Sequence, residues 1–263
     1  MKNKIRRLLI PYAFTAAVWV VPISQHFFHK DMLYLLKKYV LCIYPSQLWF
    51  LWMLFGVFAA SWPLWKIFSE NVFAGAAAAI AFYCAGVAGD MILPNIYCIW
   101  SSCQNILLFY IGIRIWKREE NETQLIYRIR PQGWFFIDII IFAVYEFLKT
   151  KNGFSADLNL VVLPLLHAAG SIMAFVSLQS IAACASYKSS RTFRLLASYS
   201  MPAYLFHQQI IYFVICWLNG KVNPYVHLCI NFAAGIVGAL AISAVLMKFK
   251  ITRILIGEKQ RGS

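Results

Sequence analysis

Eight long hydrophobic runs, separated by short gaps, constrain this sequence more than any other feature. They lie near residues 8–23, 47–65, 72–93, 96–116, 133–149, 158–183, 199–218 and 225–247. A helix satisfies its own backbone hydrogen bonds and needs roughly 20 apolar residues to cross the hydrocarbon of a bilayer. Because 61% of the chain is hydrophobic and only 13% is charged, a soluble core cannot bury all of these runs. The sequence therefore predicts an all-α integral membrane protein, a single membrane domain over residues 1–263 with about eight transmembrane helices.

The basic residues predict how these helices are oriented. An even number of spans puts both termini on one side, so the gaps fall into two sets. The set that includes the termini contains 18 Lys and Arg residues, and the other set contains six, which are Lys30, Lys37, Lys38, Lys149, Lys151 and Lys221. By the positive-inside rule, both termini are expected in the cytoplasm. The net charge of +14 is thus explained by topology, and no nucleic-acid partner is predicted.

The gap between the first two spans is predicted to hold an amphipathic helix at the outer membrane interface. This helix would cover residues 31–44 and end at Pro45. Its apolar residues recur at helical spacing, namely Met32, Leu35, Leu36, Tyr39, Val40 and Ile43. A solvated loop is the alternative.

The seven cysteines are predicted to be packing residues. Their number is odd and their spacing is not that of metal ligands, which argues against a disulfide framework and against a metal site.

Polar side chains at membrane depth are costly, so they are the candidate functional residues. His167 and His207 lie deep in the sixth and seventh spans, and at 1.5 Å per residue their depths differ by only about 5 Å. They are the candidate catalytic pair, because an imidazole can move a proton near neutral pH. A buried histidine held by a neighbour's backbone carbonyl is the structural alternative.

Other deep polar residues are predicted to line a polar cavity: Gln104, Asn105, Asp138, Tyr204 and Gln208. Tyr204, His207 and Gln208 share a face of the seventh span, which lipid would not tolerate. Helix packing is the alternative for the polar residues of the fourth span, and snorkelling to the interface is the alternative for Asp138.

Four segments, taken together and in this order, resemble the integral membrane acyltransferase 3 family. They are IRRLLIPYAF before and within the first span, QLWFLWMLF at the start of the second, CQNILLFYIGIRI in the fourth and YSMPAYLFHQQIIYF in the seventh. The likeness runs from the first residue to about residue 247.

This resemblance implies transfer of an acyl group, usually acetyl, from a cytoplasmic acyl-CoA to a hydroxyl group. The acceptor would be a cell-envelope glycan or a lipid-linked molecule at the outer face of a bacterial inner membrane. Lys4, Arg6 and Arg7 stand where the family carries a basic cluster before a proline, and with Arg114 they are predicted to bind the CoA phosphates. Acyl-CoA is a co-substrate here, and no bound cofactor is expected. Charges that only set the topology are the alternative.

The sequence departs from the family at its beginning. Family members usually start with two further spans that carry an Arg and a catalytic His, whereas this chain starts at what resembles the third span and has no counterpart of that His. An inactive, N-terminally truncated enzyme and a reduced relative that uses other residues are both open interpretations. Two other functions also stay open, a small proton-coupled multispan transporter and a membrane scaffold without catalysis.

Truncation is the favoured interpretation, and it predicts that the open reading frame continues upstream of Met1. We expect two more hydrophobic spans there, in frame, with an Arg in the first and a His about one span-depth later. Sequencing the genomic region upstream tests this. An in-frame stop codon directly before Met1 would contradict it.

Overall fold

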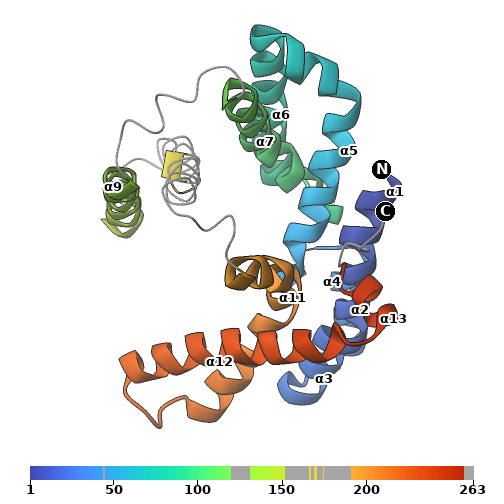
Figure 1. Cartoon of the computed structure of the whole chain (residues 1–263), viewed down its shortest axis with the longest axis vertical. Coiled ribbons are helices and arrows are strands. Elements are labelled where there is room, and N and C mark those ends of the chain that lie inside the picture. Colours follow the sequence, from blue (N-terminus) through green and yellow to red (C-terminus); the bar gives the residue numbers. More distant parts are fainter. Residues whose placement is uncertain are drawn as a thin grey trace. The chain divides into compact units, whose positions relative to one another are not determined.

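The computed structural model describes residues 1–43, 45–119, 131–151 and 191–257, together with Leu166, Ala169, Gly170 and Ala174. Every regular element in these residues is helical (Figure 1). The chain divides into two compact units: Met1–Phe109 with Arg194–Ser263 form the first, and Tyr110–Phe193 form the second. The predicted all-α class is therefore confirmed for the described part of the chain, whereas the single membrane domain stays a prediction.

Six of the described helices are long and apolar enough to cross a membrane. They are Lys2–Phe28, Ser46–Glu70, Val72–Ile92, Ile96–Arg114, Ser198–Leu218 and Pro224–Leu246, and they coincide with the first four and the last two predicted spans. The fifth predicted span lies within helix α9 (Pro131–Lys151), which is not among the six. The sixth, residues 158–183, falls outside the described residues except at four positions. The chain is thus a multi-pass membrane protein.

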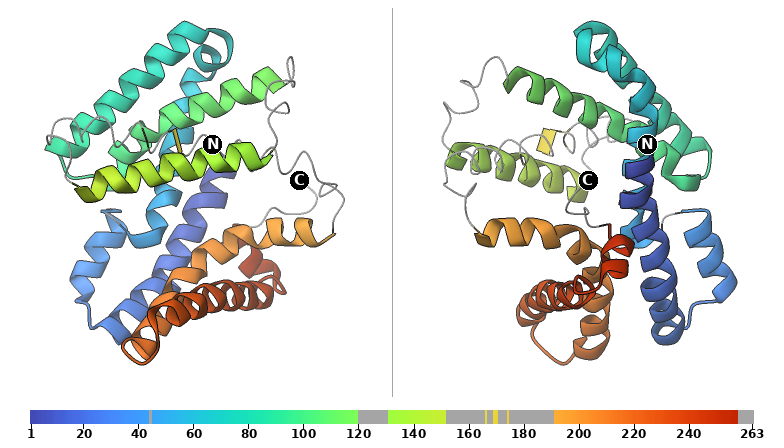
Figure 2. Two further views of the ribbon diagram at one scale, coloured as in Figure 1. Left: turned by 90° about the vertical axis from the view of Figure 1, so that its left-hand side faces the viewer. Right: turned by 45° about the vertical axis from the view of Figure 1, so that its right-hand side comes forward.

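The first span is one continuous helix whose turns widen twice (Figure 2). Its segments are α1 (Lys2–Lys4), the π-helix η1 (Ile5–Leu9), α2 (Ile10–Thr15), the π-helix η2 (Ala16–Val20) and α3 (Val21–Phe28). Each π segment directly precedes a segment with a proline in its first turn, Pro11 in α2 and Pro22 in α3. Proline cannot donate to the carbonyl four residues before it, and a wider turn accommodates the ring without breaking the helix.

The predicted amphipathic helix exists but is shorter than expected. Helix α4 covers Met32–Val40, and the side chain of Asp31 caps its start by accepting from the Tyr34 N–H at 2.9 Å. Leu35 and Tyr39 are buried against the protein, whereas the rest of the apolar stripe within the helix is exposed. The helix ends before Pro45 because Cys42 takes a left-handed backbone conformation, with φ of 51°. Its position at a membrane interface stays a prediction.

Helices α5 (Trp49–Glu70), α6 (Val72–Ile92) and α7 (Ile99–Glu119) follow in sequence, and α6 meets α7 through glycines. A Cβ atom built on Gly86 would lie 2.8 Å from both the Trp100 carbonyl oxygen and the Gln104 backbone nitrogen. The side chain of Gln104 donates to the Gly86 carbonyl at 3.2 Å. Small residues with interhelical hydrogen bonds are the usual means of helix packing in lipid.

Aromatic pairs join the first helix to α11 (Arg191–Leu218). The ring centroids are 5.6 Å apart for Trp19 with Phe206 and 5.9 Å apart for Phe28 with Tyr212, both edge to face. Helix α12 (Pro224–Leu246) packs on α11 through Gly235 and Gly238, which face isoleucines of α11. The short helix α13 (Lys250–Leu255) returns to α2, so the C-terminal part of the first unit lies beside its N-terminal helix (Figure 2).

The glycine contact of α6 with α7 generates a prediction. Replacing Gly86 by Ala should destabilise the protein by roughly 1–3 kcal/mol, since the added carbon meets backbone atoms that cannot move aside. This loss is larger than the stabilisation of up to about 1 kcal/mol that Ala gives over Gly through its higher helix propensity. Thermal unfolding of the detergent-solubilised protein measures the change.

The matched control is Gly112→Ala in α7, where a Cβ atom meets no described atom within 4 Å. An equal loss of stability in both variants would show that the α6–α7 contact is not the cause.

Candidate functional site

A network of hydrogen bonds joins the 3-10 turn η3 (Ser46–Leu48), which leads directly into α5, to the middle of α11. We call it the α5–α11 junction, and its members are Ser46, Gln47, Tyr204, Gln208 and Tyr212. The side-chain oxygen of Gln208 accepts from the Ser46 hydroxyl at 3.2 Å and from the Gln47 N–H at 3.0 Å. Its amide nitrogen donates to the Tyr212 hydroxyl at 2.7 Å. Gln208, on another helix, therefore pairs a backbone N–H of η3, the turn that leads into α5.

Gln47 adds two more hydrogen bonds to the junction. It is buried, and its side chain donates to the Leu205 carbonyl of α11 at 3.3 Å. Its own carbonyl accepts from the Tyr204 hydroxyl. Sequence reasoning singled out Tyr204 and Gln208 but not Ser46 or Gln47. The available signal was a glutamine in the first turn of a span, two residues after Pro45, where only apolar residues were expected.

The other predicted cavity residues are not part of this junction. Gln104 bonds to α6, and Asn105 donates to the Ser101 carbonyl of its own helix at 2.8 Å. The Gln104 contact joins two helices, as in the packing alternative that the sequence left open, whereas the Asn105 contact stays within α7. Asp138 belongs to the second unit, where it lines a cavity of about 390 Å³ with Tyr145 and Gly170. The structure therefore brings together Tyr204 and Gln208 only.

His207 lies on α11 beside the junction and is half-buried. Its Nδ1 atom is 2.9 Å from the Tyr204 carbonyl oxygen and 3.2 Å from that of Ala203. Both partners are acceptors, so Nδ1 must carry the proton and the neutral ring keeps its lone pair on Nε2. The helix that bears His207 thus fixes the tautomer in which Nε2 can accept a proton.

The ring of His207 lines a groove of about 450 Å³ between α11 and α12. Most of the surrounding side chains are apolar, among them Ala203, Ile211, Phe232 and Leu240. Gly235 keeps the helices close, because a Cβ atom there would lie 2.9 Å from the Ile211 side chain. His167 lies outside the described residues, so its pairing with His207 stays a prediction.

The predicted CoA-binding cations lie in two places. Lys4 and Arg6 are half-buried near the start of the first helix, where the Lys4 ammonium lies 3.6 Å above the Phe58 ring centroid. Arg7 is exposed, and its carbonyl faces the backbone of Gly257 after α13. Arg114 is half-buried on the part of α7 that belongs to the second unit. The N-terminal three therefore form a basic cluster at one end of the first helix.

Cys42 shows how the predicted packing cysteines are used. It is fully buried, and its thiol donates to the Tyr12 hydroxyl at 3.1 Å. Burial raises its pKa to about 11, so the thiol stays protonated and unreactive near neutral pH. Among the described residues, no three His, Cys, Asp or Glu side chains gather as metal ligands would.

Comparison with known proteins identifies the family of this chain. The family model described as an acyltransferase domain, that of the acyltransferase 3 family, matches residues 1–248. The chain belongs to the acyltransferase 3 family. Searches of curated proteins and of solved structures each gave no match. The resemblance seen in the four sequence segments is thereby confirmed.

Membership in the acyltransferase 3 family makes this protein a membrane acyltransferase, with an acyl donor and an acceptor as substrates. The matched residues include the basic cluster, the α5–α11 junction and His207, so all three belong to the family domain. Helix α13 lies beyond the match.

The α5–α11 junction generates a prediction about stability. Replacing Gln208 by Leu removes the acceptor of the Ser46 hydroxyl and of the buried Gln47 N–H, so both hydrogen bonds are lost. We expect a loss of roughly 1–3 kcal/mol, the usual cost of an unsatisfied buried polar group. Thermal unfolding in detergent micelles measures it.

Gln25→Leu is the control, because Gln25 is exposed on α3 and has the same side chain. Equal unfolding temperatures for Gln208→Leu and the wild type would show that the junction contributes nothing to stability.

Proposed function

We propose that this acyltransferase 3 protein transfers an acyl group, acetyl in particular, from cytoplasmic acyl-CoA to a hydroxyl of a cell-envelope glycan or lipid-linked acceptor. The membrane would be the inner membrane of a bacterium, with both termini on the cytoplasmic side. Family membership supports the reaction class. The fixed tautomer of His207 is the observation that carries the mechanism.

The basic cluster is the place proposed for the donor. Lys4, Arg6 and Arg7 offer three cations at the end of the first helix that the charge pattern assigns to the cytoplasm. CoA carries phosphates, and a guanidinium group can bind a phosphate through two parallel hydrogen bonds. The return of α13 to α2 adds Lys250 and Arg253 to the same end of the first unit.

His207 lies deeper in the same unit. Its neighbour Phe206 contacts Trp19 of the first helix, which is twelve residues beyond Arg7. At 1.5 Å per residue, this separates His207 from the basic cluster by about 18 Å along the helix axis. The pantetheine arm of CoA is a long, flexible chain, so a thioester at its tip can extend inward while the phosphates stay at the membrane surface.

The chemistry assigned to His207 is general base catalysis. Its Nε2 lone pair removes the proton from the acceptor hydroxyl as the oxygen attacks the thioester carbonyl. The carbon–sulfur bond then breaks, and the proton returns from His207 to the leaving CoA thiolate. The products are an ester and free CoA. The apolar walls of the groove would take the acyl chain and exclude water, so that the acyl group is not lost to hydrolysis.

The test replaces His207 by Gln, which keeps a polar side chain of similar reach but cannot act as a base. Transfer of labelled acetyl groups from acetyl-CoA to the glycan and lipid fractions is measured in bacterial membranes that carry the whole product of the reading frame. We expect the rate to fall by a factor of about 10² to 10⁴, as for loss of a general base.

His26→Gln is the matched control, since His26 is exposed near the end of α3, and this variant should keep the wild-type rate. Wild-type transfer by His207→Gln, at equal amounts of protein in the membrane, would refute the role proposed for His207. Absence of transfer by the wild type to both fractions would refute the proposed reaction.

A further inference from the structure

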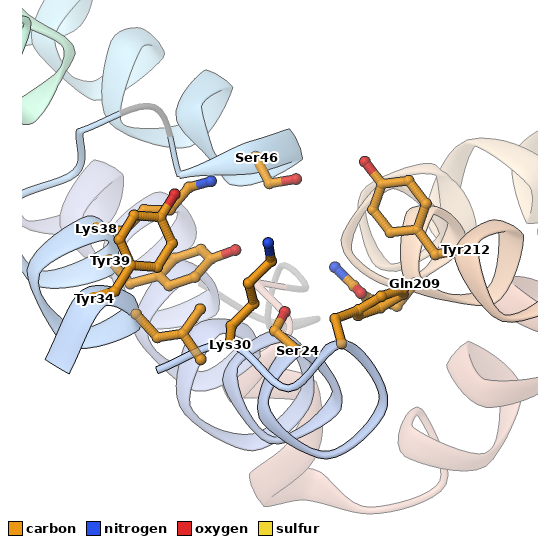
Figure 3. Close-up of a pocket in the computed structure, with 10 residues that line it drawn as sticks. Ser24, Lys30, Tyr34, Lys38, Tyr39, Ser46, Gln209 and Tyr212 are labelled. Atoms are coloured by element: carbon orange, nitrogen blue, oxygen red, sulfur yellow. The ribbon is translucent and has the colours of Figure 1, made fainter. Parts of the chain in front are cut away.

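A second cavity in the first unit is distinct from the groove of His207. It has a volume of about 300 Å³ and lies between the end of α3, helix α4 and helix α11 (Figure 3). We call it the α3–α4–α11 cavity. Its polar lining includes Lys30, Lys38, Tyr34, Ser46, Gln209 and Tyr212. Gln209 follows His207 by two residues, which turns its side chain by about 200° around α11, so the two sites open on opposite faces of this helix.

The cavity is positively charged. Lys30 and Lys38 line it, and none of its lining residues is acidic. Figure 3 shows the Lys30 ammonium projecting into the space between Ser46 and Gln209. The nearest acid in the sequence, Asp31, is used to cap α4. The two lysines belong to the few basic residues that the charge pattern assigns to the outer side, so the positive-inside rule does not account for them.

Hydroxyl groups surround the two ammonium groups. Tyr34 and Tyr39 contribute theirs from α4, Tyr212 from α11 and Ser46 from η3. Burial, together with the nearby Tyr212 and Tyr34, raises the pKa of Tyr39, so this phenol keeps its proton at physiological pH. Tyr212 accepts from Gln208, which leaves its own O–H as a donor. The cavity therefore offers mainly positive charge and O–H donors, the groups that solvate an anion.

Gln209 is a polar side chain that the protein itself does not fully satisfy. Only 3% of its surface is exposed, and its Oε1 atom has no hydrogen-bond partner in the described structure. Its amide nitrogen is turned toward the cavity in Figure 3. This nitrogen is a donor, from which an oxygen atom of a molecule bound in the cavity could accept a hydrogen bond.

We infer that the α3–α4–α11 cavity binds a phosphate-bearing, hydroxylated headgroup. Lys30 and Lys38 neutralise the phosphate charge as compact ammonium donors, while Gln209 and the tyrosine hydroxyls bond to the hydroxyl groups beside it. The headgroup could reach the cavity as part of a bilayer lipid or as a soluble phosphate ester, which share this chemistry. The inference concerns binding alone and does not depend on the role of His207.

The experiment titrates the protein, purified in an uncharged detergent, with sn-glycerol 3-phosphate, and with glycerol as the probe that lacks the phosphate. The rise in unfolding temperature reports binding. We expect saturable stabilisation by sn-glycerol 3-phosphate and none by glycerol. The double variant Lys30→Gln/Lys38→Gln should bind about tenfold or more weakly, because two charge-assisted contacts are lost.

Lys37→Gln is the matched control. Lys37 lies on the same helix, is exposed and does not line the cavity, so this variant should bind as the wild type does. The inference fails if sn-glycerol 3-phosphate does not bind, if the double variant binds like the wild type, or if Lys37→Gln weakens binding equally. Gln209→Met should lose the preference for sn-glycerol 3-phosphate over inorganic phosphate, and an unchanged preference would remove Gln209 from the site.

Mixed micelles that contain phosphatidylglycerol distinguish a headgroup that belongs to a bilayer lipid from a soluble phosphate ester. Displacement of sn-glycerol 3-phosphate by this lipid, but not by phosphatidylcholine, assigns the cavity to a bilayer headgroup. Failure of phosphatidylglycerol to compete assigns it to a soluble phosphate ester. Binding at this cavity should not depend on acyl transfer. His207→Gln is therefore expected to bind sn-glycerol 3-phosphate as the wild type does.

Discussion

The amide oxygen of Gln208 joins α5 to α11, and the positions of both sites on α11 depend on that contact. Helix termini leave backbone donors unpaired, and in a bilayer no water is available to pair them. Gln208 accepts from Gln47 and Ser46 in η3, the turn that leads into α5, and the Gln47 side chain donates to the Leu205 carbonyl of α11. Two helices that are far apart in sequence are thereby held at one rotation and one depth.

Because the rotation of α11 is fixed, each of its faces contacts a different neighbouring element. One face carries His207 toward α12, the next carries Gln208 toward α5, and Gln209 with Tyr212 faces α3 and α4. Three consecutive residues therefore line the groove beside α12, hold the bond to Ser46 and Gln47, and line the α3–α4–α11 cavity. A change in the rotation of α11 would affect all three together, which is why a buried polar bond is more useful here than apolar packing alone.

The sequence was sufficient for the features that depend on hydrophobicity. Six predicted spans correspond to helices of suitable length and composition, and the helix at Met32–Val40 was expected from the spacing of its apolar residues. The early end of that helix at Cys42 could not be seen, because a left-handed residue that is not glycine has no clear signature in the sequence.

The polar contacts were less predictable, because they depend on rotation about the helix axis as well as on depth. Depth along a span can be counted in residues, and this is how the sequence placed His207 and Tyr204 in the interior of the seventh span. The partner of Gln208 lies about 160 residues away in the sequence, and no local pattern specifies such a pair. Gln209 was missed for the same reason, since the polar stripe was assigned to the neighbouring face.

The close approach of Gly257 to the first helix has a consequence for the order in which the chain folds. Gly257 has φ of 79°, and a Cβ atom there would lie 2.8 Å from the Arg7 carbonyl oxygen and from Pro11, so only glycine fits between these backbones. The partners are about 250 residues apart. During synthesis the first helix enters the bilayer long before its last neighbour leaves the ribosome, and this contact of very high sequence separation must be among the last to close. Until then, the surface of the first helix around Arg7 and Pro11 stays uncovered.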